Sequence, residues 1–177
     1  MAIYLLGGVV LFLLGQRGIE LRLAGRNRRW ALAQGAREYG AEHYPLFFLL
    51  HGCWFVGWVI EAFVRGPVLR DEWWLWLGLF AAAQWLRYWA IITLGPRWNT
   101  RILVIPGLAP VQSGPYRYLR HPNYVAVALE LLVIPLIFNA WLTALLATLL
   151  NAALLRFIRI PAEEKALTGT FPPTANL

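Results

Sequence analysis

Residues 125–160 read VAVALELLVIPLIFNAWLTALLATLLNAALLRFIRI, and this almost uninterrupted apolar stretch decides the fold. As one helix, its 36 residues would be about 54 Å long, whereas the hydrocarbon core of a bilayer is roughly 30 Å thick. The stretch must therefore fold back on itself. Pro135 and Asn139, within IPLIFNAW, are residue types that end one helix and let another begin. The sequence predicts a tight helical hairpin with its turn at this point.

Three further apolar stretches precede it, at 2–23, 44–64 and 73–94. Each is close to the roughly 20 residues that a membrane-spanning helix needs. The chain of 177 residues is 59% hydrophobic and 14% charged, with a mean hydropathy of +0.54, which excludes a soluble globular domain. We therefore expect residues 1–177 to form a single all-α integral membrane domain of about five transmembrane helices, the last two being the hairpin.

Basic residues are concentrated on one side of this predicted bundle, and the formal net charge is +7. Thirteen of them lie around the end of the first stretch and before the second, between the third and fourth, or towards the end of the chain: Arg17, Arg22, Arg26, Arg28, Arg29, Arg37, Arg97, Arg101, Arg117, Arg120, Arg156, Arg159 and Lys165. The other side has only Arg65 and Arg70. The positive-inside rule therefore places the N-terminus outside and the C-terminus in the cytoplasm. It also explains the charge without a nucleic-acid partner.

The longest polar segment, at 94–124, is rich in glycine and proline, and ordered loops of this length are usually functional. It ends in SGPYRYLRHPNY, and RIPAEEKAL follows the hairpin. In its order and spacing, R-H-P-x-Y followed by E-E resembles the isoprenylcysteine carboxyl methyltransferase family and its relatives among membrane phospholipid methyltransferases. The resemblance covers about residues 85–167, and the compact chain is most similar to prokaryotic members.

This resemblance implies that the chain binds S-adenosylmethionine at the cytoplasmic face of the membrane, in a fold unrelated to Rossmann methyltransferases. The cofactor-binding residues that it implies are Arg120, His121, Pro122, Tyr124, Glu163 and Glu164. It also implies a multi-pass protein of a prokaryotic cytoplasmic membrane.

The cofactor presents a carboxylate, an ammonium group, a ribose diol and a sulfonium cation, and elementary chemistry gives each of these groups a partner here. Arg120 can hold a carboxylate through two hydrogen bonds, and Pro122 suits the first turn of a helix whose N-terminus favours an anion. Glu163 or Glu164 can accept from an ammonium group or a ribose. Aromatic faces attract a sulfonium cation, and three are available: Tyr116, Tyr118 and Tyr124. Taken singly, the same residues also suit topology, interfacial anchoring and helix dipoles, and Tyr116 and Tyr118 fit that structural interpretation better.

Three ionisable residues fall inside the predicted spans at a common level. His51, Arg87 and Glu130 each lie about 10–12 Å below the cytoplasmic boundary, where charges are costly. In one interpretation Arg87 and Glu130 form a buried ion pair, with His51 hydrogen-bonded nearby. In the other, all three are catalytic together with Arg120: they line the pocket where an acceptor oxygen meets the methyl group, and supply a cation or a base for an oxyanion.

The function expected from the sequence is S-adenosylmethionine-dependent methyl transfer to a carboxylate or phenolic oxygen. The acceptor would be a lipophilic molecule or prenylated group from the bilayer, either prenylcysteine-like or an alkylated phenol or pyrone. Two alternatives remain: an NADPH-dependent membrane lipid reductase, because sterol reductases share a similar C-terminal region, and a non-catalytic lipid-binding scaffold. The chain has no clear basic cluster for the extra phosphate of NADPH, and we expect no metal site.

Overall fold

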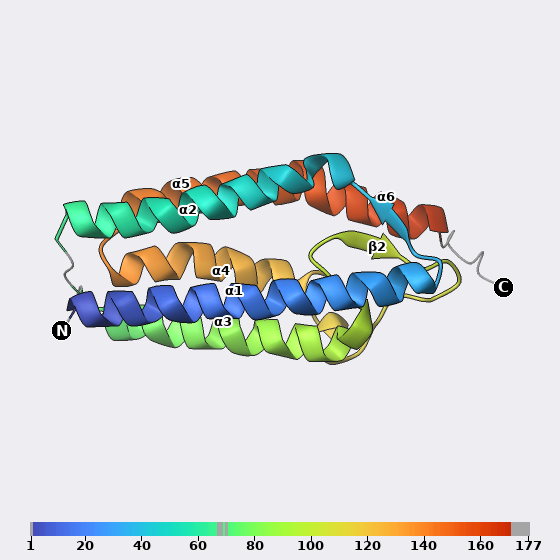
Figure 1. Cartoon of the computed structure of the whole chain (residues 1–177), viewed down its shortest axis with the longest axis horizontal. Coiled ribbons are helices and arrows are strands. Elements are labelled where there is room, and N and C mark those ends of the chain that lie inside the picture. Colours follow the sequence, from blue (N-terminus) through green and yellow to red (C-terminus); the bar gives the residue numbers. More distant parts are fainter. Residues whose placement is uncertain (1, 67–68, 70, 171–177) are drawn as a thin grey trace.

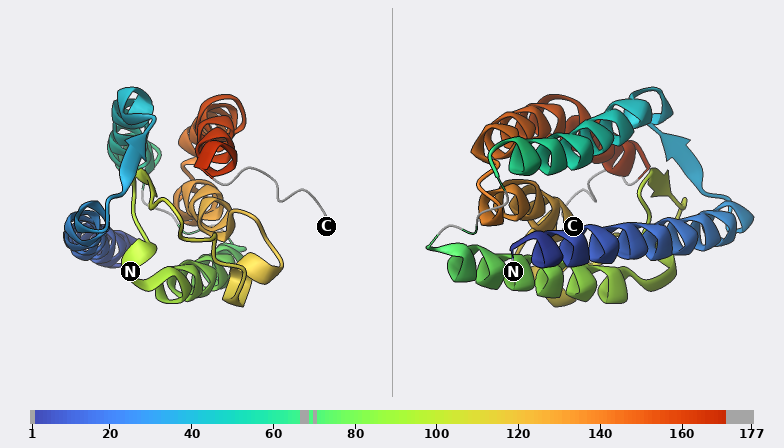
Figure 2. Two further views of the ribbon diagram at one scale, coloured as in Figure 1. Left: turned by 90° about the vertical axis from the view of Figure 1, so that its right-hand side faces the viewer. Right: turned by 60° about the vertical axis from the view of Figure 1, so that its left-hand side comes forward.

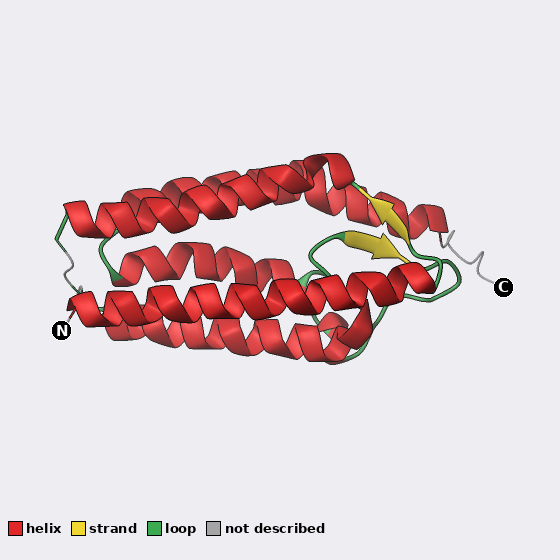
Figure 3. Cartoon of the chain, in the orientation of Figure 1, coloured by secondary structure: helices red, strands yellow, loops and turns green. Residues whose placement is uncertain are grey.

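The structure is a computed structural model that describes residues 2–66, 69 and 71–170. It is an elongated helical bundle with two short strands at one end (Figures 1 and 3). The helices are α1 (Ala2–Ala33), α2 (Tyr44–Val64), α3 (Trp73–Leu94), α4 (Pro122–Ile137), α5 (Trp141–Leu154) and α6 (Ile160–Thr170). Arg70 and the C-terminal tail from residue 171 lie outside the described residues.

The mostly helical fold predicted from the sequence is confirmed, with helices apolar enough to span a membrane. Helices α2 and α3 occupy the predicted ranges 44–64 and 73–94. Four helical stretches of the described chain are long and apolar enough to cross a bilayer: Ala2–Ala33, Ala41–Val64, Trp73–Arg97 and Trp141–Gly169. Helix α4 is apolar but has only 16 residues, or about 24 Å. A count of five membrane spans therefore stays a prediction.

The predicted hairpin is present between α4 and α5 (Figure 1). Pro135 lies in the last turn of α4, and its carbonyl accepts the amide of Ala140 at 2.9 Å. Asn139 has a φ of 59°, the left-handed conformation that asparagine adopts more readily than most residues. The side chain of Glu61 on α2 then accepts the amide of Thr143 at 2.8 Å, which satisfies an otherwise free donor in the first turn of α5.

Helix α1 is longer than predicted. The sequence placed its end near residue 23 and the following arginines in a loop, but the helix continues to Ala33. Hydropathy falls after residue 15, whereas alanine, leucine, arginine and glutamate continue, and these residues favour helix whether or not they are buried. The basic residues from Arg17 to Arg29 are therefore fixed on one rigid element.

Two strands that the sequence did not predict lie at the same end as α6. Strand β1 (Arg37–Tyr39) pairs antiparallel with β2 (Ile102–Val104), with Arg37 opposite Val104. Three residues are too few to show an alternating pattern, which explains why the sequence gave no signal. The pair joins the segment after α1 to the loop after α3 and so closes one end of the bundle (Figure 3).

Helix α4 lies in the middle of the bundle, with α1, α2, α3 and α5 around it (Figure 2). Small residues allow α3 and α4 to pack closely: Ala83, Ala90 and Ala126 are fully buried. Gly114, in the loop, packs in the same way against α3. It has a φ of 56°, and a Cβ there would lie 2.4 Å from Oγ1 of Thr93, so only glycine fits.

Candidate active site

Two adjoining cavities lie towards the end of the bundle that carries the strands. The first, which we call the motif cavity, has a volume of about 230 Å³ and is lined by the 94–124 loop, β2, the start of α4, and α6. The second, the helix cavity, has a volume of about 450 Å³ and is lined mainly by apolar residues of α1, α2, α4 and α5. Four residues line both cavities: Trp98, Asn123, Tyr124 and Arg159.

Tyr124 joins the two sequence motifs. Its hydroxyl donates to Glu163 on α6 and accepts from Nε of Arg159 at 3.0 Å. Its ring stacks on His121, with centroids 5.2 Å apart and planes 14° from parallel. The structure therefore brings R-H-P-x-Y and E-E into contact across the hairpin. From the sequence alone, the only reason to expect the two motifs to be close is the resemblance to the family.

The remaining predicted motif residues surround this contact. Pro122 is buried as the first residue of α4, as the sequence predicted. Nδ1 of His121 is 4.0 Å from Glu163, and its Nε2 is 3.9 Å from Glu164. Arg120 lines the motif cavity, and its side chain is 88% exposed. Its ionic contact with Glu164 is long at 3.8 Å, so its guanidinium is available to a ligand.

Of the other two tyrosines, Tyr116 lines the motif cavity and Tyr118 is exposed. Burial, and then the negative charge of Glu163, raise the pKa of Tyr116. Its phenol is therefore neutral at physiological pH. Tyr116 offers the motif cavity an aromatic face, while Tyr118 fits the structural interpretation.

Glu38 on β1 fixes one wall of the motif cavity. Its carboxylate accepts from Arg28 of α1 at 3.0 Å and from Arg101, which lines the cavity. Partial burial alone would raise the pKa of Glu38, but the hydrogen bonds and charges of the two arginines outweigh burial and hold the pKa below 4.5. The pair of ionic contacts thereby ties α1 to the loop.

Replacing Glu38 with glutamine should lower the free energy of unfolding at pH 7 by about 1 kcal/mol. Because the folded-state pKa is below the unfolded value, this stability is fully present above pH 4.5 and is lost as the pH falls through the folded-state pKa. Thermal unfolding of wild type and E38Q between pH 7 and pH 3 measures it. A difference that does not shrink on acidification would contradict the assignment. Glu42→Gln, at a side chain that is 81% exposed, is the control and should change the free energy of unfolding at pH 7 by less than about 0.5 kcal/mol.

The sequence interpretation missed Arg159 as a site residue and counted it only as a topogenic charge. It ends a single π-helical turn, Leu155–Arg159, between α5 and α6, and such turns are often found at functional sites. Besides Tyr124, it donates to the carbonyl of Thr100 at 2.9 Å. The side chain is only 6% exposed. An arginine two residues before a proline and inside an apolar run was the available signal.

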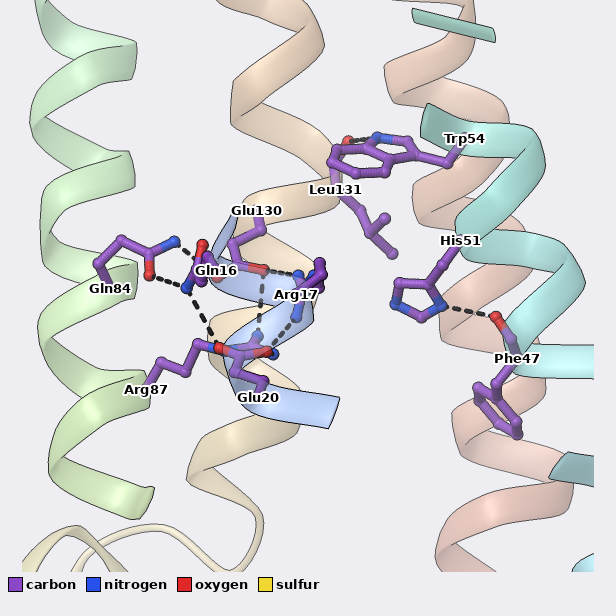
Figure 4. A network of polar contacts seen from close by, with 10 residues as sticks. All are labelled: Gln16, Arg17, Glu20, Phe47, His51, Trp54, Gln84, Arg87, Glu130 and Leu131. Atoms are coloured by element: carbon purple, nitrogen blue, oxygen red, sulfur yellow. Dashed lines mark hydrogen bonds and ion pairs between the residues drawn. The ribbon is translucent and has the colours of Figure 1, made fainter. Parts of the chain in front are cut away.

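A buried ion-pair network connects α1, α3 and α4 (Figure 4). Arg87 donates to both carboxylate oxygens of Glu20 at 2.6 Å and to Glu130 at 3.1 Å. Arg17 donates to the same two glutamates, at 2.8 Å in the case of Glu20. Two glutamines complete the network: Gln16 and Gln84. Two guanidinium groups thus balance two carboxylates, which is the condition under which charges are tolerated at membrane depth.

The predicted Arg87–Glu130 pair is therefore confirmed, but its surroundings differ from the prediction. His51 does not bond to the pair: its Nδ1 lies 2.7 Å from the carbonyl of Phe47 on its own helix. The ring projects from α2 towards the network (Figure 4). The unpredicted partners, Arg17 and Glu20, lie on α1 within the predicted stretch 2–23, where Arg17 was counted only for topology. Gln16 and Glu20, four residues apart, were the signal for a polar helix face.

The network forms one wall of the helix cavity. Arg17, Glu20 and Arg87 line it, and His51 lines it from α2. Glu130 is fully buried behind them. The side chain of Arg17 is 31% exposed and Arg87 only 4%, so Arg17 is the guanidinium most open to this cavity. A polar wall within an apolar cavity suits a lipid with a polar head group.

Residues 76–169 match the family model described as the isoprenylcysteine carboxyl methyltransferase (ICMT) family. The match begins in α3 and ends in α6, so it includes both motifs and the cavity residues between them. The predicted resemblance, over 85–167, lies within this range.

Two bacterial proteins are similar to almost the whole chain. The uncharacterized protein YpbQ of Bacillus subtilis (strain 168) is 40% identical over 160 residues, which cover 90% of this chain and 94% of that protein. An uncharacterized protein of Haemophilus influenzae (strain ATCC 51907 / DSM 11121 / KW20 / Rd) is 27% identical over 161 residues, covering 90% and 93%. No solved structure matches the chain.

Proposed function

The chain belongs to the isoprenylcysteine carboxyl methyltransferase family, and from this premise we propose that it transfers the methyl group of S-adenosylmethionine to an oxygen of a lipophilic acceptor. The observation that carries the proposal is the junction of the two cavities. The more polar of the two cavities, built from both motifs, adjoins a larger and more apolar one, with Tyr124 and Arg159 lining both. A polar methyl donor and a lipid acceptor need two such compartments that meet at one point.

The donor set of the motif cavity fits the cofactor. Arg120 is exposed, and its long contact of 3.8 Å with Glu164 leaves it able to hold a carboxylate. Glu163 in the cavity wall, and Glu164 beside Arg120, offer oxygens for an ammonium group or ribose hydroxyls. The aromatic faces of Tyr124 and Tyr116 suit a cation. When bound, S-adenosylmethionine supplies an electrophilic methyl group on a sulfonium. The contribution of the chain is to hold the two reacting groups in line, which accounts for much of the rate of such a transfer.

The helix cavity can serve either of the two acceptor types. A carboxylate is already ionised, and Arg17 or Arg87 would orient it. A phenol or enol must lose its proton, and His51 is placed to take it. Its Nδ1 faces a carbonyl, which can only accept, so Nδ1 carries the hydrogen and Nε2 is left as a base. Tyr124 and Arg159, which line both cavities, would border the place where this oxygen meets the methyl group that the cofactor would supply.

The distribution of charge supports a cytoplasmic motif cavity. The strands, the 94–124 loop and α6 all lie at the end of the bundle opposite the start of α1 (Figure 1). The arginines of the second half of α1 lie towards the same end. By the positive-inside rule this end faces the cytoplasm, where the cofactor is made available, and the start of α1 lies outside.

An NADPH-dependent reductase is the second candidate among enzymes, because four arginines line the motif cavity. Three of them are already engaged. Arg97 donates to the carbonyl of Ala109, Arg101 to Glu38, and Arg159 to Tyr124 and Thr100. Only Arg120 is left for a ligand, which is enough for a carboxylate but a weak site for a ribose phosphate. The arrangement favours methyl transfer.

Titrating the purified full-length protein with S-adenosylhomocysteine and, separately, with NADPH tests the proposal through thermal unfolding. We expect S-adenosylhomocysteine to raise the unfolding temperature and NADPH to leave it unchanged. A ligand at 100 times its Kd adds about 2.7 kcal/mol to the stability of the folded state, which such a titration detects readily. Stabilisation by NADPH alone would overturn the proposal in favour of a reductase, and stabilisation by neither would favour a non-catalytic protein.

A further inference from the structure

Asn151, on α5, lines the helix cavity with its side chain only 1% exposed. Its Nδ2 is buried and has no hydrogen-bond partner in the part of the chain that the structure describes. Nearly all buried polar groups in folded proteins are paired, because an unpaired donor loses its hydrogen bond to water without replacement. An unpaired amide in the wall of a cavity therefore points to a ligand.

The charged groups of α1 and α3 that line this cavity already have partners. Arg17, Glu20 and Arg87 satisfy one another, and the hydroxyl of Tyr44 is 3.3 Å from that of Thr100. Within the described residues, two further unpaired groups lie at the junction with the motif cavity: Nε1 of Trp98 and Oδ1 of Asn123. Trp98 is only 2% exposed. An unused donor, on Trp98, and an unused acceptor, on Asn123, thus lie at the place where the proposed reaction occurs.

A buried asparagine with a purely structural role looks different in this protein. Asn27, on α1, is 2% exposed, and its Nδ2 donates to the carbonyls of Trp98 at 2.9 Å and Gly95 at 3.2 Å. A second comparison is Thr148, one turn before Asn151 on α5. Its Oγ1 is also buried and without a partner among the described residues, but Thr148 lines neither cavity. Asn151 combines the unpaired donor with a place in the cavity wall.

We propose that Asn151 determines the specificity of the helix cavity by donating a hydrogen bond from its side-chain amide to an oxygen of the lipid acceptor. The acceptor would carry this second oxygen near the one that is methylated, as a carboxylate or a phenol with a second oxygen substituent does. Its hydrocarbon chain would lie against apolar residues such as Phe48 and Phe55. This inference rests on the proposed function in taking the occupant of the helix cavity to be the acceptor.

Lipid binding without the cofactor tests this. The full-length protein, N151L and T148V are titrated with N-acetyl-S-farnesylcysteine, a carboxylate, and with 5-pentadecylresorcinol, a phenol with two oxygens. Pentadecylbenzene, which has no oxygen, is the control lipid. We expect wild type and T148V to bind at least one oxygenated lipid roughly tenfold more tightly than pentadecylbenzene, and N151L to lose that preference.

The unfolding temperatures without lipid give an independent readout. Leucine branches at Cγ as asparagine does, has no unpaired donor, and stands at the wall of a cavity that can take its larger methyl groups. N151L should therefore unfold at the same or a higher temperature than wild type, whereas N27L should unfold at a lower one. The proposal is overturned if N151L keeps the preference, if wild type shows none, or if N151L is destabilised as N27L is. Because no cofactor is present, these outcomes are separate from a failure of methyl transfer itself.

Discussion

Replacing Arg87 with methionine is expected to lower the free energy of unfolding by about 3–5 kcal/mol, the typical cost of removing one partner from a buried ion pair. Arg87 donates to Glu20 and Glu130, whose side chains are 5% and 1% exposed. Without it, Arg17 alone faces two buried carboxylates. Chemical denaturation in detergent measures the loss. Arg22→Met is the matched control on an exposed site of α1, and it should change stability by less than about 0.5 kcal/mol.

The double replacement of Arg87 by methionine and Glu130 by leucine separates structure from catalysis. It leaves Arg17 paired with Glu20 at 2.8 Å, so the network stays neutral. We therefore expect the double variant to lose less free energy of unfolding than the sum of the losses of the two single variants, by about 0.5–3 kcal/mol. Loss of turnover in this folded variant would support a catalytic role for the network. Full turnover would restrict the network to a structural role.

Replacing Glu163 with glutamine is expected to weaken S-adenosylhomocysteine binding by roughly 10- to 100-fold, the value of one hydrogen bond to a charged group. Glu163 lines the motif cavity, accepts from Tyr124 and lies 4.0 Å from His121. Glutamine has the same shape but cannot balance an ammonium group. The Kd of S-adenosylhomocysteine for wild type and E163Q measures the effect.

Glu164→Gln provides the graded comparison for this experiment. Glu164 follows directly on α6, but its side chain is 48% exposed and is not part of the cavity wall. Solvent screens its charge, so we expect E164Q to weaken binding less than E163Q does. Equal affinities for wild type and E163Q would remove Glu163 from the cofactor site.

The hairpin and the middle helices could be predicted because hydropathy and length suffice for them. A 36-residue apolar stretch has one physical solution in a bilayer, and Pro135 and Asn139 marked its turn. The extension of α1 could not be found by the same means, since it depends on helix propensity after the apolar stretch has ended. Strands of three residues carry no periodic signal, so β1 and β2 were also beyond a reading of the pattern.

The candidate site, like the fold, could be predicted only in part from the sequence. R-H-P-x-Y and E-E are contiguous motifs that can be read directly from the sequence. Of their six predicted site residues, four line the motif cavity: Arg120, His121, Tyr124 and Glu163. Arg17, Glu20 and Arg159 act through partners far away in the sequence: Glu20 is 67 positions from Arg87, and Arg159 is 35 from Tyr124. A basic residue near the end of a span has the same appearance whether it sets the topology or enters a network. Only the packing of the helices decides between these roles.

The most direct measurement of the central claim is transfer of a labelled methyl group from S-adenosylmethionine to a lipid extract by the purified full-length protein. We expect label to enter an extractable lipid as an O-methyl group, at a rate that rises with the amount of wild-type enzyme. The rate should be roughly tenfold lower with E163Q. Label that stays in the donor at saturating lipid, with protein that is folded and binds S-adenosylhomocysteine, would contradict the account.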